Sequence, residues 1–193
     1  FNSLISNVKV GKHNLPALKN EINIITKKFG KFVKGNGWID FENELINNLY
    51  EYNKKYFPSP NYVLNIKNHT INEFEYGKKR ESEFLKIYDG LLKEYQIKIQ
   101  PESSTNSFLN KWYIEPVRIE INFLKDEIKK ITDKDIRDVM YLILSRTTRS
   151  CRATKHEDLA TLVEPITRTY YCHKHYKICK PLFSMQHWWE YYS

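Results

Sequence analysis

Two consecutive stretches of apolar residues at helical spacing constrain the fold more than any other feature of this sequence. In the first stretch the apolar positions are Val117, Ile121, Leu124, Ile128 and Ile131. In the second they are Ile136, Val139, Met140, Ile143 and Leu144. This spacing places each set on one face of an α-helix. Thr132 or Asp133 is suited to cap the second helix, and the short connection favours an antiparallel helix pair.

Earlier parts of the chain carry the same helical period. Asn14 is placed to cap a helix over 15–29, and Asp40 is placed to cap a second helix over 41–56. A third helix is expected over 73–95, followed by a polar loop over 96–107. Residues 1–10 form a short apolar element, helix or strand. Apolar residues alternate within 61–72, so a short strand is possible there.

The texture of the sequence changes after residue 146. Pro165, Pro181 and a β-prone run around Tyr170 predict a small hairpin spanning 168–179. The expected fold is therefore mainly α, a helical bundle-like domain with a small β-hairpin element near the C-terminus. Hydrophobic residues make up 41% of the chain and aromatic residues 15%, which argues against disorder.

The formal net charge of +8 favours a polyanionic partner. The alternative is a compositional bias, because the chain is rich in Lys, Asn and Ile, and much of the Lys is scattered over helix faces. No apolar run approaches the roughly 18 residues that a membrane helix requires, so no membrane partner is expected. Three cysteines without a secretory signal are typical of a reduced, cytoplasmic protein.

A string of cations follows the second helix of the strong pair. Arg146, Arg149, Arg152 and Lys155 recur every three residues, with small hydroxyl side chains between them and no acid from 139 to 156. On a continuing helix these four would lie along one side. Guanidinium forks away from carboxylates suit phosphate groups. The alternative is a solvated helix end, where the helix dipole favours cations.

A cluster of thiols and imidazoles lies in the predicted hairpin. Cys172, His173, His175 and Cys179 suggest a zinc site, with Cys151 or His156 as a further ligand. The spacing argues against this, because structural zinc sites usually pair ligands two to four residues apart, twice. We therefore expect no metal ligands in the chain. A cysteine–histidine nucleophile has no local support either, and no catalytic residue is expected.

Two interpretations of this hairpin remain. It is either a strand pair with half-buried cysteines, or a DNA-facing strand whose basic side chains contact phosphates while tyrosines pack or stack. In the second case the contacts would come from Lys174, Lys177 and Lys180, with Arg168 as a weaker candidate.

Three stretches, taken in order, resemble the DNA methyltransferases that modify adenine N6 or cytosine N4. The stretch 2–9, Asn-Ser-Leu-Ile-Ser-Asn-Val-Lys, is similar to the segment that follows the acid gripping the ribose of S-adenosylmethionine, with Ser3 in place of the usual proline. The stretch 112–116, Trp-Tyr-Ile-Glu-Pro, precedes the helix pair. The stretch 144–150, Leu-Ser-Arg-Thr-Thr-Arg-Ser, closes it.

The resemblance implies an internal segment between the cofactor-binding and catalytic motifs, neither of which occurs in this sequence. Residues 1–10 would be the edge of the preceding cofactor-binding domain, 11–155 a helical domain, and 156–193 a basic, aromatic Cys-His arm. The resemblance further implies double-stranded DNA and the remainder of the methyltransferase chain as partners. S-adenosylmethionine would be the cofactor of the parent enzyme, and this segment would have no cofactor of its own.

Two other functions compete with this interpretation. One is a non-enzymatic nucleic-acid-binding module of a restriction or defence system. The other is a helical protein-interaction domain whose charge is compositional. Salt-dependent binding to nucleic acid is expected of the methyltransferase segment and of the nucleic-acid-binding module, but not of the protein-interaction domain.

Overall fold

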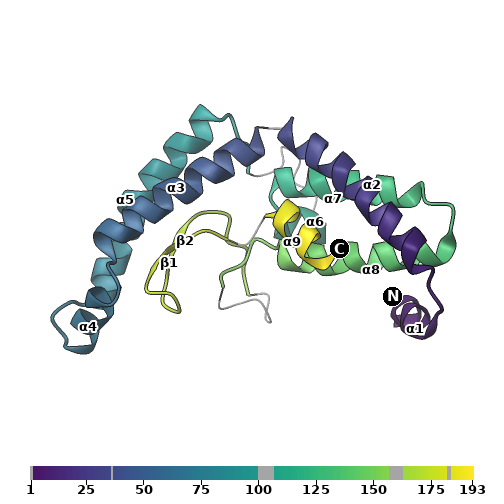
Figure 1. Ribbon diagram of the computed structural model, residues 1–193. Helices are drawn as coiled ribbons and strands as arrows, with labels where there is room; N and C mark the ends of the chain where they lie inside the picture. The colour runs from purple at the N-terminus through teal and green to yellow at the C-terminus, as the bar shows by residue number, and fades with distance from the viewer. Residues whose placement is uncertain (1, 36, 100–106, 157–162, 182–183) are drawn as a thin grey trace. The chain divides into compact units, whose positions relative to one another are not determined.

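The computed structural model describes residues 2–35, 37–99, 107–156, 163–181 and 184–193, and these form nine α-helices and one two-stranded antiparallel sheet (Figure 1). The helices are α1 Asn2–Val10, α2 Leu15–Lys34, α3 Trp38–Tyr56, α4 Asn61–Lys67, α5 Glu73–Glu94, α6 Phe108–Trp112, α7 Glu115–Lys129, α8 Lys134–Ser150 and α9 Met185–Tyr192. The strands are β1 Tyr170–Cys172 and β2 Lys177–Cys179. The predicted fold class, mainly α with a hairpin near the C-terminus, is confirmed.

The chain divides into two compact units, each built from stretches that are distant in the sequence. Unit 1 comprises Phe1–Asn36, Gln100–Arg152 and Phe183–Ser193. Unit 2 comprises Gly37–Ile99 and Ala153–Leu182. The division at residues 10 and 155 that was drawn from the sequence stays a prediction. In the described residues, no helix combines the length and the apolar character needed to cross a membrane.

Unit 1 is organised around the predicted helix pair α7 and α8. The Oδ1 atom of Asp133 accepts hydrogen bonds from two backbone N–H groups in the first turn of α8, which confirms it as the cap. Helix α2 packs against α7, and α9 packs against both α8 and α2 (Figure 1). The side chain of Trp189 on α9 is fully buried, and its Nε1 donates a hydrogen bond to Oγ1 of Thr26 at 2.9 Å. Helix α9 therefore completes the core of unit 1.

Unit 2 consists of the long helices α3 and α5, which lie side by side, with the hairpin packed against both (Figure 1). The side-chain amide of Asn53 on α3 bonds both backbone groups of Ile178, at 2.9 and 3.0 Å. The backbone N–H of Tyr171 donates to Glu81 of α5 at 2.9 Å. Polar side chains of two helices thus satisfy the outer edges of a sheet that is only three residues long.

Glycine at position 77 of α5 allows this close packing. A Cβ atom built there would lie 2.8 Å from two ring carbons of Tyr171 on β1. The ring can approach the helix only because Gly77 has no side chain. At Gly90 of the same helix, by contrast, a Cβ would meet nothing within 4 Å.

Two local predictions were wrong, and one short helix was missed. Residues 61–67 form helix α4 instead of a strand, because Tyr62 and Ile66, four residues apart, face the protein while Leu64 is exposed. Asp40 does not cap α3, which begins after Gly37 in a left-handed conformation with φ of 64°. The short helix α6 was not predicted. Residues 100–106 of the expected loop lie outside the described residues.

Candidate nucleic-acid interface

The basic string identified in the sequence does not lie on one continuous helix. Helix α8 ends at Ser150, and the backbone N–H of Cys151 bonds back to Thr148 at 3.0 Å. Cys151 and Ala153 are buried, so the chain turns inward instead of extending the helix into solvent. Arg146 and Arg149 lie on α8, and Arg152 follows its end. Lys155 belongs to unit 2, so the expectation of four cations along one helix is corrected.

Three of the predicted cations do converge within unit 1. Arg146, Arg149 and Arg152 line a groove with a volume of about 830 Å³. Its walls come from α1, α6, α8 and α9, and no carboxylate lies among its described lining residues. The remaining lining residues are Ile5, Phe108, Leu109, Tyr113, Val139, Leu142, Ile143, Ser145, Thr148 and Tyr192. The groove is therefore basic at the end of α8 and apolar along the middle of that helix.

Aromatic side chains hold two of the three guanidinium groups. The guanidinium of Arg146 lies 5.4 Å from the ring centre of Tyr192, and that of Arg152 lies 5.9 Å from the ring centre of Phe108. Burial raises the pKa of Tyr113, and a hydrogen bond from Arg152 partly offsets this rise. These contacts keep the arginines beside planar surfaces without neutralising their charge.

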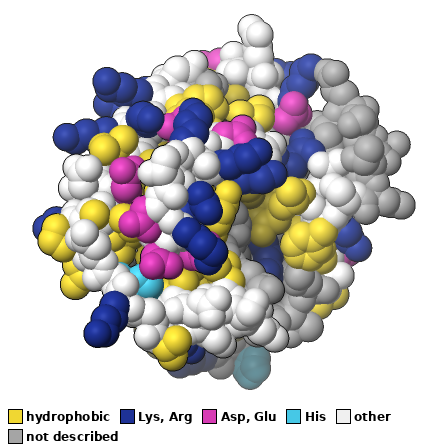
Figure 2. Space-filling view, turned by 90° about the vertical axis from the view of Figure 1, so that its right-hand side faces the viewer, with side chains coloured by type: hydrophobic (Ala, Val, Ile, Leu, Met, Phe, Trp, Pro, Cys, Tyr) yellow, Lys and Arg dark blue, Asp and Glu magenta, His cyan; other side chains and the backbone are white. Residues whose placement is uncertain are grey.

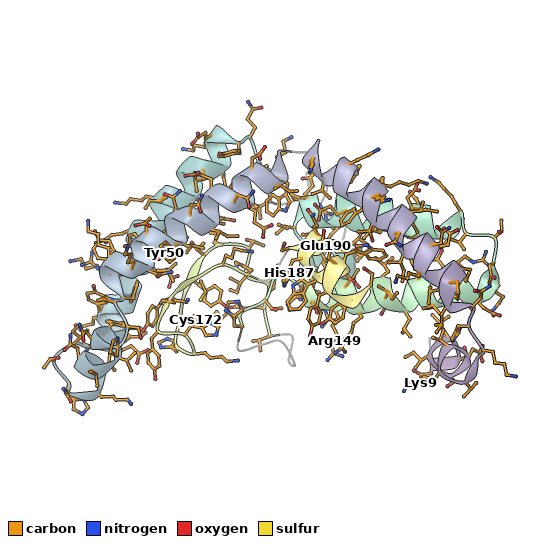
Figure 3. The ribbon with its side chains drawn as sticks, in the orientation of Figure 1. Lys9, Tyr50, Arg149, Cys172, His187 and Glu190 are labelled. Carbon is orange, nitrogen blue, oxygen red and sulfur yellow. The ribbon has the colours of Figure 1, made fainter. Side chains whose placement is uncertain are left out.

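The charge of these three arginines is not compensated within the described part of the chain, where none of them forms an ion pair. Arg146 and Arg149 are exposed, and Arg149 projects away from α8 (Figure 3). Elsewhere the charge is dispersed. On the face shown in Figure 2, Lys and Arg side chains alternate with hydrophobic and acidic ones. Net charge alone therefore does not locate an interface on this molecule, whereas the convergence of the arginines does.

The basic side chains of unit 2 differ in their surroundings. Lys174 and Lys177 are exposed at the hairpin. Arg168 lies 3.6 Å from a carboxylate oxygen of Asp89. The ammonium of Lys180 donates to Glu42 at 2.6 Å, and the Lys180 side chain is only 18% exposed. Arg168 and Lys180 thus have internal carboxylate partners, which makes them weaker candidates for phosphate contacts than Lys174 and Lys177.

The structure also brings together, in unit 2, four side chains of the types that ligate metal ions. The ligand atoms of His156, Cys172, His175 and Cys179 all lie within 4.8 Å of one another. His173, which the sequence offered as a ligand, instead bonds Glu73 at 2.8 Å, and Cys151 lies in unit 1. All three cysteines of the chain are in the thiol form.

Burial shapes the ionisation of this cluster. It lowers the pKa of His156 to about 4, aided by the nearby charges of His175 and Lys174, so that the imidazole is neutral at pH 7. Burial also raises the pKa of the Cys179 thiol to about 12, and a second thiol at Cys172 adds to the effect. Both groups are therefore in their uncharged forms at neutral pH.

Several residues of the arginine groove and of the cluster of thiols and imidazoles were not identified from the sequence. Tyr113, Tyr192 and Phe108 join the arginine groove, and their signal was the aromatic character of the stretches around 112 and 188–192. His156 was considered only as an optional ligand, because it lies sixteen positions before Cys172 and outside the expected hairpin.

Comparison with known proteins gave one informative relative. No family model matches the chain, and no solved structure matches it. Among curated proteins, it is similar to the type II methyltransferase M.MjaII of Methanocaldococcus jannaschii, with 38% identity over 185 residues. The match covers 94% of this chain, while the chain spans only 35% of that protein's length. The resemblance to a segment of a longer methyltransferase is thus confirmed.

Proposed function

We propose that, as a segment of a DNA methyltransferase, this chain makes the target-recognition-like contacts with double-stranded DNA. The observation that carries the proposal is the convergence of Arg146, Arg149 and Arg152 on one groove without a carboxylate among its described lining residues. The parent enzyme would transfer a methyl group from S-adenosylmethionine to adenine N6 or cytosine N4. Its cofactor loop and catalytic motif would lie outside this chain, which would contribute no catalytic residue.

The guanidinium groups are the donors that this groove offers to phosphates. The hydroxyl of Thr148 donates to the backbone carbonyl of Ser145 at 3.0 Å, and the hydroxyls of Ser150 and Tyr192 bond each other at 3.1 Å. These hydroxyls are used within unit 1. Arginine forks bind phosphate oxygens in a bidentate manner, so three arginines suffice for a short run of backbone.

The aromatic side chains beside the arginines suit a distorted duplex. Enzymes that modify a base within DNA extrude it from the stack, which exposes sugar and base surfaces near the displaced backbone. Tyr192 and Phe108 lie next to Arg146 and Arg152 and offer planar surfaces for such contacts. A groove that combines both side-chain types supports the proposed role in holding the backbone while the target base is displaced.

The apolar part of the same groove supports the remainder of the methyltransferase chain as a second partner. Leu109 is 42% exposed and lines the groove together with apolar residues of α8. Contacts of this kind bury apolar area and depend weakly on salt. If the chain served only protein interaction, which is the competing function, it would show no salt-dependent binding to a DNA duplex.

Duplex binding at several salt concentrations tests the proposal. We expect the affinity of the protein for a labelled duplex, measured by fluorescence anisotropy, to fall steeply as salt rises, because bound arginines displace counterions. The substitution Arg149→Ala should lower the slope of log K against log salt by about 1. Arg149→Lys should keep most of the slope, since it retains the charge, but should weaken binding through loss of the bidentate fork.

The matched control is Lys129→Ala, which removes an exposed cation of α7 that does not line the groove. We expect its salt slope to equal that of the wild type. The proposal fails if the wild type binds no duplex in a salt-dependent manner, or if Lys129→Ala and Arg149→Ala reduce the slope equally.

A further inference from the structure

We propose that unit 2 contains a structural zinc site formed by His156, Cys172, His175 and Cys179. The inference is independent of the proposed function, because it rests on the hairpin and not on the arginine groove. It also departs from the expectation, based on spacing along the sequence, that the chain has no metal ligands. The usual spacing of zinc ligands along the sequence did not predict this cluster. The hairpin turn brings Cys172, His175 and Cys179 together, and His156 joins them from an earlier segment of the chain.

Two of the distances between ligand atoms match tetrahedral coordination, and all four atoms lie within 4.8 Å of one another. Nδ1 of His175 lies 3.5 Å from Sγ of Cys172 and 3.5 Å from Sγ of Cys179. A zinc ion holds sulfur at about 2.3 Å and nitrogen at about 2.0 Å, and a tetrahedral angle then separates the two ligand atoms by about 3.5 Å. His175 is thus placed against both thiols at the separation that a shared zinc ion would impose.

The hairpin explains how three of the ligands meet. Cys172 pairs with Lys177, and Cys179 lies two residues further along β2, so the two thiols are diagonal neighbours on the same face of the sheet. The backbone N–H of His175 bonds the carbonyl of Cys172 at 3.2 Å, and Tyr176 has a positive φ of 52°. This tight turn returns the His175 side chain to the face that carries both cysteines.

Two hydrogen bonds bring the fourth ligand to the same face. The backbone N–H of His156 donates to the Tyr170 hydroxyl at 2.7 Å, and the N–H of Ile166 donates to the carbonyl of Ala153 at 2.7 Å. The rings of His156 and His175 are 4.8 Å apart, centre to centre. Nδ1 of His156 is buried and has no hydrogen-bond partner among the described residues. A metal bond in this site would offset the cost of leaving that atom unpaired.

The chemistry of the four ligands selects the ion and its role. Two thiolates and two imidazoles in a tetrahedral arrangement favour zinc over the harder divalent cations. Four protein ligands leave no open position for water, so the site stabilises the fold and performs no catalysis. Binding would release the two thiol protons to solvent and give a zinc centre without net charge. Such a centre does not repel the nearby cations Lys174 and Lys177. The ion would tie both strands to the segment 153–156.

Metal analysis tests the site directly. We expect the protein, prepared in reducing buffer without chelators and reconstituted with zinc chloride, to hold about one zinc ion per chain by mass spectrometry. Cys172→Ser and Cys179→Ser should each lose most of it. The matched control Cys151→Ser removes a buried thiol of unit 1 and should keep the ion. Likewise, His175→Asn should lose zinc, whereas the neighbouring His173→Asn should retain it.

A second measurement distinguishes lost ligands from lost folding. Cobalt(II) should replace zinc and give the absorption of a tetrahedral ion with two thiolates. His175→Cys should retain cobalt with a stronger thiolate-to-metal band, since it substitutes one ligand for another. The proposal is overturned by substoichiometric metal in the reconstituted wild type, by a disulfide between Cys172 and Cys179 under reducing conditions, or by equal loss of zinc in the control variants. Failure of duplex binding would leave all of these results unchanged.

Discussion

The arginines that line the groove of unit 1 and two of the candidate cations of unit 2 differ in their surroundings, although Lys174 and Lys177 of unit 2 are also exposed. In unit 1, Arg146 and Arg149 are exposed at the end of α8, and within the described residues neither forms an ion pair. In unit 2, Lys180 is bonded to Glu42 and Arg168 lies beside Asp89. The sequence offered all of these residues as candidates for DNA contact, with Arg168 as a weaker one. Cations become candidates for DNA contact through what surrounds them, because a pairing carboxylate offsets the charge that attracts phosphate.

The units also differ in what closes their cores. Unit 1 is completed by a buried tryptophan from the last helix, whereas unit 2 is completed by a hairpin packed on a glycine. The three predictions below target one unit at a time, so each can sharpen this contrast or remove it.

Truncation of Trp189 should affect unit 1 most. The side chain is fully buried, its ring lies edge-on to Phe29 with centres 6.5 Å apart, and it bonds Thr26. We expect Trp189→Ala to lower the free energy of unfolding by about 3–5 kcal/mol in urea titrations. Hydrogen exchange should accelerate in α2, α7 and α8. The control Tyr191→Ala removes a side chain that is 70% exposed, and its effect should stay within about 0.5 kcal/mol.

The same exchange measurement shows whether the two units unfold separately. If Trp189→Ala accelerates exchange in α3 and α5 as much as in α2 and α8, the two units unfold as one cooperative body. The division into two units would then describe how the chain packs, and the units would not differ in their stability towards unfolding.

Substitution of two glycines in α5 should act on unit 2 with opposite signs. Gly77→Ala places a Cβ against the ring of Tyr171, whose hydroxyl is held by Tyr62 and Glu73, each at 3.1 Å. Because the ring cannot shift freely, we expect a loss of about 1–3 kcal/mol in the free energy of unfolding. Gly90→Ala meets open space and should gain up to about 1 kcal/mol from helix propensity. Equal effects of the two variants in urea titration would show that the hairpin does not pack on Gly77 in solution.

Neutralisation of Glu127 should have the smallest effect. Hydrogen bonds from Lys130 and then Lys28 lower the pKa of this carboxyl, whose side chain is 9% exposed. The stabilising contribution is therefore present above the usual carboxyl pKa and is lost as pH falls through the lowered value. Since Lys28 is half exposed, Glu127→Gln should cost about 1 kcal/mol or less at pH 7 and nothing at low pH.

Thermal unfolding across pH measures this effect, with Asp126→Asn as the control at an exposed position of the same helix. A stability difference between wild type and Glu127→Gln that persists unchanged into strong acid would contradict the ion-pair explanation. It would point to packing of the Glu127 side chain instead.

Prediction from the sequence succeeded where the determining contacts are local. The apolar periods and the caps Asn14 and Asp133 gave the correct helices, since both depend on residues within one or two turns. It failed for α4, where alternating apolar residues suggested a strand but only Tyr62 became buried. It also failed for the start of α3, because the spacing of apolar residues does not reveal the left-handed conformation of Gly37.

The candidate sites divide in the same way. Arg146 and Arg149 share one helix, so their proximity followed from spacing alone. Arg152 joins them only because the chain turns at Cys151 and enters the same groove. The set of four potential metal ligands could not be assembled from spacing, since His156 reaches the hairpin through its bond to Tyr170.

The sequence by itself determined the helical class of this protein, the caps of α2 and α8 and the excess of positive charge. The tertiary structure alone decided which cations acquire carboxylate partners, which aromatic side chains flank the arginines, and which thiols and imidazoles meet. The physical reason is the range of the interactions. Helical hydrogen bonds join residues four apart, whereas ion pairs and ligand clusters join residues whose separation along the chain says nothing about their distance in space.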